Sequence, residues 1–207
     1  IAVLVADSGG RPVAVFQQPT DVTSQQRTLD GIAAAVEQAL ALVPATLSEV
    51  AAIGLGIPGR VHPASGLVEA AVNLGWRRLL AGPLLAERLG VPVHLENDAR
   101  AAALGAYAAG DERRFPNWAY ITVGTGIAAG LILNGQLYRG PNGMAGEIGH
   151  VIVQPGGPRC VCGLHGCLEA VAAGPAILRE ARARLDMAPD NFSHSLLDVP
   201  GQLTTAQ

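Results

Sequence analysis

The pattern of apolar and polar residues predicts a β-hairpin and a helix at the start of the chain. Residues 1–6 and 12–16 are apolar runs, and the segment Asp7-Ser8-Gly9-Gly10 between them is typical of a hairpin turn. Across residues 29–42, Ala and other apolar residues recur at helical spacing, and Pro44 follows. We therefore expect two paired strands followed by one amphipathic helix.

The next segments alternate between strand and helix patterns. Residues 50–57 predict a buried strand, so we expect Gly59 and Arg60 on a turn at its carboxyl end, where open α/β sheets collect ligands. Residues 83–89 predict a helix, 91–95 a strand and 99–109 an Ala-rich helix. The segment Glu96-Asn97-Asp98 lies at the last strand-to-helix junction, where Asn97 or Asp98 can either cap the helix or face a ligand.

Two further strands, 118–123 and 129–133, flank Gly124-Thr125-Gly126. The backbone N–H groups and the Thr125 hydroxyl of such a turn can receive a phosphate, but the same residues also suit a plain hairpin. Asn134-Gly135 predicts another turn, and residues 168–185 predict a helix. This order indicates an α/β or α+β protein of two lobes, 1–112 and 113–207, with the break near residues 111–116.

Composition narrows the classes of partner. The 207 residues suffice for one good core or two small lobes, and 49% hydrophobic with 15% charged residues is typical of a soluble globular protein. We expect no membrane partner, because no apolar run approaches a membrane span and the first residues lack a basic signal-peptide start. Lys is absent, and a net charge of -3 without a basic patch argues against nucleic acid as a partner of this segment.

Every cysteine of the chain falls within one short stretch that predicts a zinc site. His150, Cys160, Cys162 and Cys167 have the spacing H-x9-C-x-C-x4-C, which fits a closed, structural Cys3His site that holds a loop of polar groups in shape. Scattered core thiols, or one disulfide plus a spare thiol, are the alternatives, and the close Cys160-Val161-Cys162 pair is awkward for both. Reduced cysteines also indicate the cytoplasm.

The fourth zinc ligand is ambiguous in the sequence, because His165 also lies inside the cluster. We prefer His150, since a ligand about ten residues upstream closes a loop, whereas His165 is crowded next to Cys167.

Four elements together resemble the ROK family (repressors, open reading frames and sugar kinases). They are Glu96-Asn97-Asp98-Ala99, Gly124-Thr125-Gly126, the run from Gly146 to His150, and Cys160-x-Cys162-Gly163-x-x-Gly166-Cys167-x-Glu169. The resemblance implies an actin-like, hexokinase-type fold of two lobes about a cleft, each built on a ribonuclease-H-like sheet. It also implies transfer of the γ-phosphate of ATP to a hexose or an N-acetylhexosamine, and homodimers, which are common in the family.

Carried over to this sequence, the resemblance implies a role for each matching residue. Asp98 would be the general base, and Thr125 with Gly126 would form the second phosphate loop for ATP and Mg²⁺. His150 would bind zinc through one ring nitrogen and face the sugar with the other. The remaining implied sugar contacts are Gly59, Arg60, Asn73, Asn97, Glu147 and Glu169.

The chain departs from the family kinases in three ways. It starts at Ile1, just after the place of the first phosphate loop Asp-x-Gly-Gly-Thr, and it lacks the C-terminal helices and adenosine-binding segment, so we expect a fragment truncated at both ends. The second phosphate loop continues Ile127-Ala128-Ala129 where glycines are usual. Alanine would be strained there if the backbone φ is positive, which would weaken nucleotide binding.

Two functions follow from the resemblance. One is a sugar kinase, such as a glucokinase or N-acetylhexosamine kinase, supported by Asp98 and the set of sugar contacts. The other is the sugar-sensing domain of a ROK repressor, which would bind DNA only through a further upstream helix-turn-helix domain. Regulators of the family often lose the first phosphate loop or the base, and the segment from Asn73 to Arg77 resembles segments common among these regulators.

Overall fold

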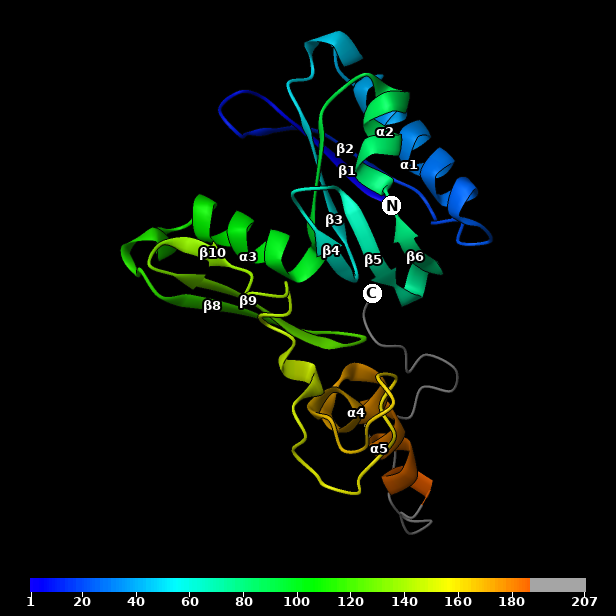
Figure 1. Ribbon diagram of the computed structural model, residues 1–207, viewed down its shortest axis with the longest axis vertical. Coiled ribbons are helices and arrows are strands. Elements are labelled where there is room, and N and C mark those ends of the chain that lie inside the picture. The colour runs from blue at the N-terminus through cyan, green and yellow to red at the C-terminus, as the bar shows by residue number, and fades with distance from the viewer. Residues whose placement is uncertain (187–207) are drawn as a thin grey trace. The chain divides into compact units, whose positions relative to one another are not determined.

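The computed structural model describes residues 1–186, and the chain divides into two compact units with the boundary after Ala101 (Figure 1). The two lobes expected from the sequence, 1–112 and 113–207, stay a prediction, and residues 187–207 lie outside the described part. Helices and strands are both present in each unit, which confirms the predicted α/β class.

The first unit opens with the predicted hairpin of β1 (Ala2–Ala6) and β2 (Pro12–Gln17), which pair antiparallel. Helix α1 (Gln25–Leu40) follows and begins four residues before the predicted start. The Ser24 hydroxyl accepts the backbone N–H of Arg27 and so caps a polar first turn that carries no apolar periodicity. The helix buries an apolar face that includes Ile32 and Val36.

A parallel pair of strands supports the rest of the first unit. Strand β3 (Ile53–Ile57) pairs with β7 (Val93–Asn97), and Ile57 lies opposite Asn97 at the carboxyl ends. Residues 50–52, predicted as part of β3, instead follow a short 3₁₀ helix (Leu47–Glu49). Helix α2 (Ala81–Leu89) precedes β7, and α3 (Asp98–Ala109) starts directly after it. The two parallel strands therefore end side by side, as expected for a ligand edge.

The first unit also contains a small antiparallel sheet that the sequence pattern did not predict. Strands β4 (Arg60–His62), β5 (Leu67–Ala71) and β6 (Trp76–Leu79) form it, with a 3₁₀ turn (Val72–Leu74) before β6. These strands are three to five residues long and lack a clean polar–apolar alternation, so they give little periodic signal. Arg60 consequently opens β4 and does not lie on the expected turn, whereas Gly59 does lie in the bend.

The second unit is built around β8 (Trp118–Val123), β9 (Ile127–Leu133) and β10 (Gln136–Tyr138), in the order β10-β9-β8. A 3₁₀ helix (Asp111–Arg114) leads into β8. The predicted Asn134-Gly135 turn is present, because both residues have positive φ, 52° and 74°. Strand β9 begins two residues earlier than expected, at Ile127.

The end of the second unit corrects one prediction. Residues 168–185 form not one helix but two, α4 (Leu168–Ala172) and α5 (Gly174–Asp186), with Ala173 extended between them (φ -72°, ψ 163°). Pro175 accounts for the break, because a proline inside a continuous helix lacks an N–H and clashes with the preceding turn. A 3₁₀ turn (Ile148–His150) lies upstream. Within residues 1–186, none of the helices has the length and apolarity that crossing a bilayer requires.

Candidate functional site

The junction between β7 and α3 holds Asn97 almost completely buried. Its side-chain Oδ1 accepts the backbone N–H of Arg100 at 3.1 Å, and its Nδ2 donates to the carbonyl oxygen of Gly59 at 3.1 Å. Asn97 therefore caps α3, as one of the two sequence interpretations held, and also ties the end of β7 to the turn after β3. The carboxamide keeps one N–H and one lone pair beyond these two bonds.

Asp98, the predicted base, is exposed at the first turn of α3. Its Oδ1 accepts a hydrogen bond from the backbone N–H of Ala99 at 2.9 Å, and the other carboxylate oxygen takes no part in this bond. A Cβ on Gly56 of β3 would lie 3.4 Å from the Asp98 Cα, so the strand end is packed closely beneath it. The arrangement presents a carboxylate to solvent at the carboxyl end of β7.

A buried ion pair supports this junction and was missed in the sequence. Arg100 is only 1% exposed, and its Nε lies 2.9 Å from Oε1 of Glu96. The same Glu96 oxygen accepts the backbone N–H of Asn97 at 2.9 Å. The spacing of Glu96 and Arg100 by four residues is the only sequence signal, and an exposed helical pair would have the same spacing.

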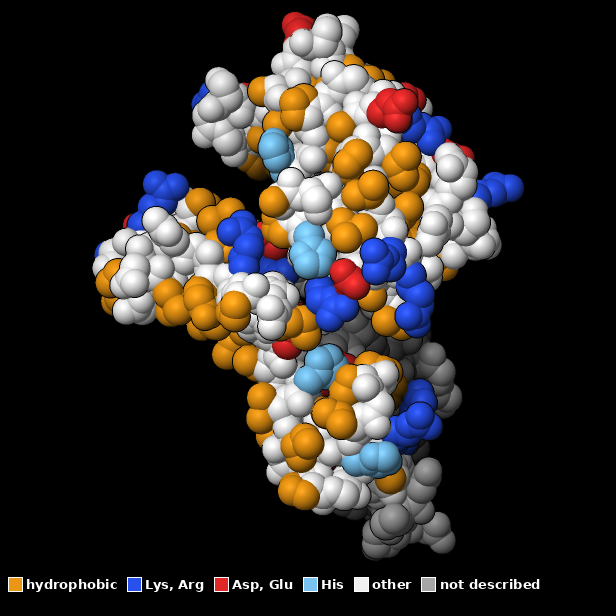
Figure 2. Space-filling view, in the orientation of Figure 1, with side chains coloured by type: hydrophobic (Ala, Val, Ile, Leu, Met, Phe, Trp, Pro, Cys, Tyr) orange, Lys and Arg blue, Asp and Glu red, His pale blue; other side chains and the backbone are white. Residues whose placement is uncertain are grey.

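Charged side chains also gather over the β4–β5–β6 sheet, as Figure 2 shows. Glu69 lies 3.6 Å from the Arg60 guanidinium and 3.2 Å from Nε2 of His62. Glu69 was not singled out in the sequence, although it pairs with Arg60, one of the predicted sugar contacts. Asn73 is exposed in the 3₁₀ turn before β6, whereas Trp76 is a core residue at 1% exposure.

The turn between β8 and β9 is tight and unstrained. The Gly124 N–H donates to the carbonyl oxygen of Gly126 at 2.9 Å, and the Thr125 side chain is exposed at the tip. Ala128 and Ala129 are in strand β9 and are not among the described residues with positive φ. The strain that alanine would suffer at positive φ therefore does not arise.

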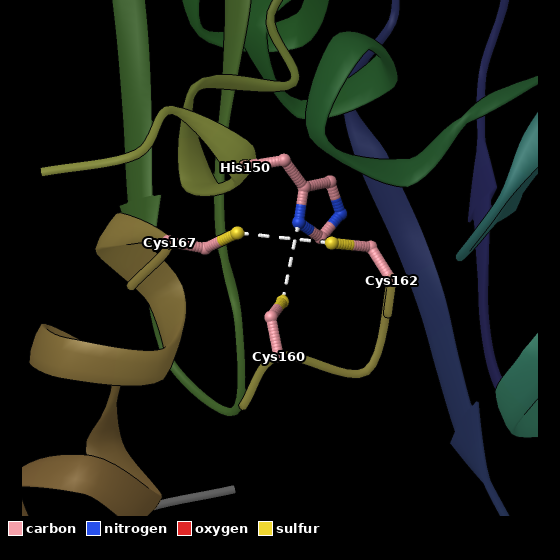
Figure 3. A group of neighbouring side chains, drawn as sticks. All are labelled: His150, Cys160, Cys162 and Cys167. Carbon is pink, nitrogen blue, oxygen red and sulfur yellow. Dashed lines mark hydrogen bonds between the residues drawn. The ribbon is translucent and has the colours of Figure 1, made fainter. Parts of the chain in front are cut away.

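The four predicted zinc ligands converge in the second unit, as Figure 3 shows. One ligand atom from each of His150, Cys160, Cys162 and Cys167 lies within 4.8 Å of the others. His150 Nδ1 is 3.6 Å from Cys160 Sγ, and the sulfurs of Cys162 and Cys167 are 3.7 Å apart. A tetrahedron with Zn–S bonds of about 2.3 Å has edges of roughly 3.8 Å, so the donor set fits zinc.

His150 lies among the three sulfurs, as preferred from the sequence, whereas His165 is exposed outside this group of donors and forms a backbone β-bridge with Arg159. The three thiols are free, so the disulfide alternative is wrong.

Burial raises the pKa of Cys167 to about 12, and the neighbouring thiols add to the shift. In contrast, a hydrogen bond from the Leu164 backbone lowers the pKa of exposed Cys162. Three thiolates this close would repel one another unless a cation lay among them.

Glycines let the loop approach its neighbours. A Cβ on Gly146 (φ 91°) would overlap the carbonyl oxygen of Ala129 in β9, and a Cβ on Gly166 (φ 76°) would overlap the carbonyl oxygen of Gln154. In addition, the Ala129 N–H donates to the Gly146 carbonyl oxygen at 2.7 Å. The segment that carries Glu147 and His150 is therefore held directly against β9.

Glu169 lies near the start of α4, two residues after Cys167, and is half-buried. Its Oε2 accepts the backbone N–H of Ile127 at 3.0 Å. This contact spans 42 residues of sequence and joins the metal-binding loop to the end of the Gly124–Gly126 turn. Glu147, also half-buried, lies at the N-cap of the 3₁₀ turn that ends at His150.

The predicted site residues thus fall into groups that the structure brings together within each unit. In the first unit, Gly59 contacts Asn97, Asp98 follows on the same strand end, and Arg60 pairs with Glu69. In the second unit, Glu169 reaches the residue after Gly126, and the metal donors surround a common centre.

Known proteins resemble the chain along nearly its whole length. The chain is 37% identical to a glucokinase of Streptomyces coelicolor over 190 residues, which is 92% of this chain and 58% of that enzyme. A ROK family glucokinase from Streptomyces griseus, solved with glucose and AMPPNP, superposes with a TM-score of 0.80 at 37% identity, over 92% of this chain and 59% of that one.

A transcriptional regulator of the same family is just as similar in structure. This homologue of the E. coli MLC protein superposes with a TM-score of 0.82 at 30% identity, over 91% of this chain and 48% of its own. The chain therefore spans about half to three fifths of the length of these proteins. The model of the ROK family matches residues 1–195, and the chain belongs to the ROK family.

Proposed function

We propose that the chain is the sugar-binding part of a ROK sugar kinase that transfers the γ-phosphate of ATP to a hydroxyl of a hexose, such as glucose or an N-acetylhexosamine. The observation that carries the proposal is the exposed carboxylate of Asp98 at the carboxyl end of β7, anchored by the Ala99 N–H. Similarity to glucokinases, one of them solved with glucose and AMPPNP, supports the reaction class.

Asp98 is the general base in this proposal. A carboxylate within hydrogen-bond reach of the acceptor hydroxyl takes its proton as the oxygen attacks phosphorus, which typically contributes about 10²- to 10⁴-fold to the rate. Thr125 and the Gly126 backbone are proposed to receive phosphate oxygens, and Mg²⁺ would neutralise charge on the transferred group. Ala128 and Ala129 are extended in β9, which is compatible with a phosphate-binding turn before them.

Sugar hydroxyls are both donors and acceptors, which suits the proposed contacts. The proposed sugar contacts are Gly59, Arg60, Asn73, the remaining N–H of Asn97, Glu147, Glu169 and Nε2 of His150, whose Nδ1 faces the sulfurs. Carboxylates accept from hydroxyls, and an amide or guanidinium donates to them. The Arg60–Glu69 pair supports this role, since it restrains a long side chain before the ligand arrives.

Zinc has a structural part in the proposal. The Cys3His donors would hold it in a closed site, and its contribution is to fix the imidazole of His150 and the backbone on either side. The two units are proposed to be lobes of an actin-like, hexokinase-type fold, which the similarity to ROK kinase structures supports.

A sugar-sensing domain of a ROK transcriptional regulator is the second candidate. It is favoured by the TM-score of 0.82 to a family regulator, which matches that of the glucokinase. In this reading Asp98 and the sugar contacts bind ligand without turnover, and DNA is bound by another part of the protein.

An assay of the natural full-length protein tests the choice. ADP formation is followed with ATP, Mg²⁺ and a panel of glucose, mannose, fructose, N-acetylglucosamine and N-acetylmannosamine, and sugar binding is measured in parallel by calorimetry. Turnover of at least one sugar supports the kinase. Tight sugar binding without turnover favours the regulator, and the absence of both would overturn the sugar site.

A further inference from the structure

The backbone of one residue, Ile127, is contacted at both its N–H and its carbonyl group by segments that carry metal donors. On its N–H side, Glu169 Oε2 accepts the hydrogen bond at 3.0 Å. On its carbonyl side, Gly149 approaches so closely that a Cβ there would overlap the Ile127 carbonyl oxygen. The same Cβ would lie 3.3 Å from the Glu169 Cβ, so the three residues pack against one another.

Both contacting residues are close neighbours of metal donors. Gly149 directly precedes His150, and Glu169 follows Cys167 by two residues in the first turn of α4. Cys167 is fully buried, and the Leu168 N–H donates to the Val151 carbonyl oxygen at 2.9 Å. The backbone around the metal donors is therefore continuous with the two groups that hold Ile127.

Ile127 in turn sets the end of the Gly124–Gly126 turn. It is buried, begins β9, and lies opposite Val123 across the hairpin. The Gly126 backbone is so near the carboxylate that an added Cβ would lie 2.5 Å from Glu169 Oε2. The Gly174 N–H, at the start of α5, also donates to the Gly124 carbonyl oxygen at 2.8 Å. The turn is thus positioned from outside its own hairpin.

We propose that Glu169 is a positioning residue that links the Cys3His cluster to the Gly124–Gly126 turn. One carboxylate oxygen holds the Ile127 N–H, while the other stays available to a sugar hydroxyl, since a carboxylate offers about four acceptor sites. Loss of the metal loosens α4 and releases the turn. The sugar-linked part rests on the proposed function, whereas the link between cluster and turn does not.

Two glycines give a matched test of the link. Gly126→Ala places a methyl group against the Glu169 carboxylate and displaces it without changing its chemistry. Gly124→Ala adds the same methyl group two residues earlier, where no atom lies within 4 Å of the new Cβ. Neither glycine has a positive φ, so neither substitution strains the backbone.

Hydrogen exchange of the Ile127 amide, followed by NMR in the zinc-loaded full-length protein, reads the contact without any turnover. Glu169→Ala and Gly126→Ala are each expected to speed exchange about tenfold or more, because a hydrogen bond to a charged acceptor is lost. Glu169→Gln, which keeps an acceptor oxygen, is expected to restore part of the protection, and Gly124→Ala to leave it unchanged. Equal exchange in all four variants would overturn the proposal.

Metal removal and sugar titration separate the two parts. Chelation of zinc is expected to deprotect Ile127 in the wild type and to add little in Glu169→Ala. If chelation leaves the amide protected, the cluster does not position the turn. Titration with glucose or N-acetylmannosamine is expected to shift the Ile127 amide resonance. Sugar binding without such a shift would remove the shared carboxylate, while absence of sugar binding would count against the proposed function alone.

Discussion

The Nδ2 of Asn97 donates a hydrogen bond to the carbonyl oxygen of Gly59 at 3.1 Å, so that one buried amide fastens the end of β7 to the turn after β3. Gly59 can occupy this place only because it has no side chain. A Cβ there would overlap the Ala70 carbonyl oxygen and lie 2.9 Å from the Ala71 Cα, both of them backbone atoms of β5.

Gly59→Ala should therefore destabilise the first unit. We expect the free energy of unfolding to fall by about 2–3 kcal/mol, since backbone must move to admit the methyl group. Gly54→Ala in β3 is the matched control, because no atom lies within 4 Å of its new Cβ, and it should stay within about 1 kcal/mol of wild type. Urea denaturation of both variants checks this, and equal stability would mean that the turn yields without cost.

Asp98→Asn tests the assigned base in the full-length protein. If Asp98 takes the proton of the sugar hydroxyl, kcat should fall by about 10²- to 10⁴-fold, while sugar binding stays nearly intact because the amide has almost the same shape. Asp111→Asn, on the exposed 3₁₀ helix before β8, is the control for removal of one carboxylate charge. Undiminished turnover in Asp98→Asn would remove Asp98 from this role.

His150→Ala and His165→Ala test the metal assignment within a single loop. His150 Nδ1 lies among the three sulfurs, so its loss should lower zinc content and lower the melting temperature, because a structural zinc contributes folding free energy. His165 is exposed outside the donor group, so its variant should keep one zinc per chain and near-wild-type stability. Elemental analysis of the purified proteins is the measurement, and a zinc-free wild type would contradict the assignment.

The metal cluster was predictable because its donors are dense in sequence. Four ligands within eighteen positions leave few ways to arrange them, so spacing alone favoured His150 over His165. The strand-to-helix junction at Asp98 was also predictable. An apolar strand pattern ends just before it, and an Ala-rich helical pattern begins just after it. The hairpins at Gly9-Gly10 and Asn134-Gly135 also followed from local turn chemistry.

What the sequence did not predict depends on contacts between distant segments. The Glu169–Ile127 bond joins positions 42 apart, and no local pattern predicts that these two residues meet. The β4–β5–β6 sheet was missed because its short strands become ordered through packing around buried residues such as Trp76 and Val68. Burial of Arg100 was equally hidden, because a Glu and an Arg four residues apart give the same pattern whether they face core or solvent.

Arg100 and Arg184 offer a direct test of that last distinction. Each follows a glutamate by four residues, and each Nε lies close to a glutamate Oε1, at 2.9 Å for Glu96–Arg100 and 2.8 Å for Glu180–Arg184. The side chains differ in exposure, 2% and 13% for the first pair against 78% and 64% for the second. Geometry is thus nearly constant while the surrounding dielectric changes.

Arg100→Met should lower the free energy of unfolding by about 3–5 kcal/mol, because it takes the guanidinium away from the poorly solvated Glu96 carboxylate. Arg184→Met should change it by less than about 1 kcal/mol, since water solvates both partners. Denaturant titration measures both, and Glu96→Gln combined with Arg100→Met should recover part of the loss by removing the carboxylate charge. Equal effects at the two positions would mean that water reaches Arg100 in the native protein, and that the backbone of Asn97 and Asp98 is not held by a buried ion pair.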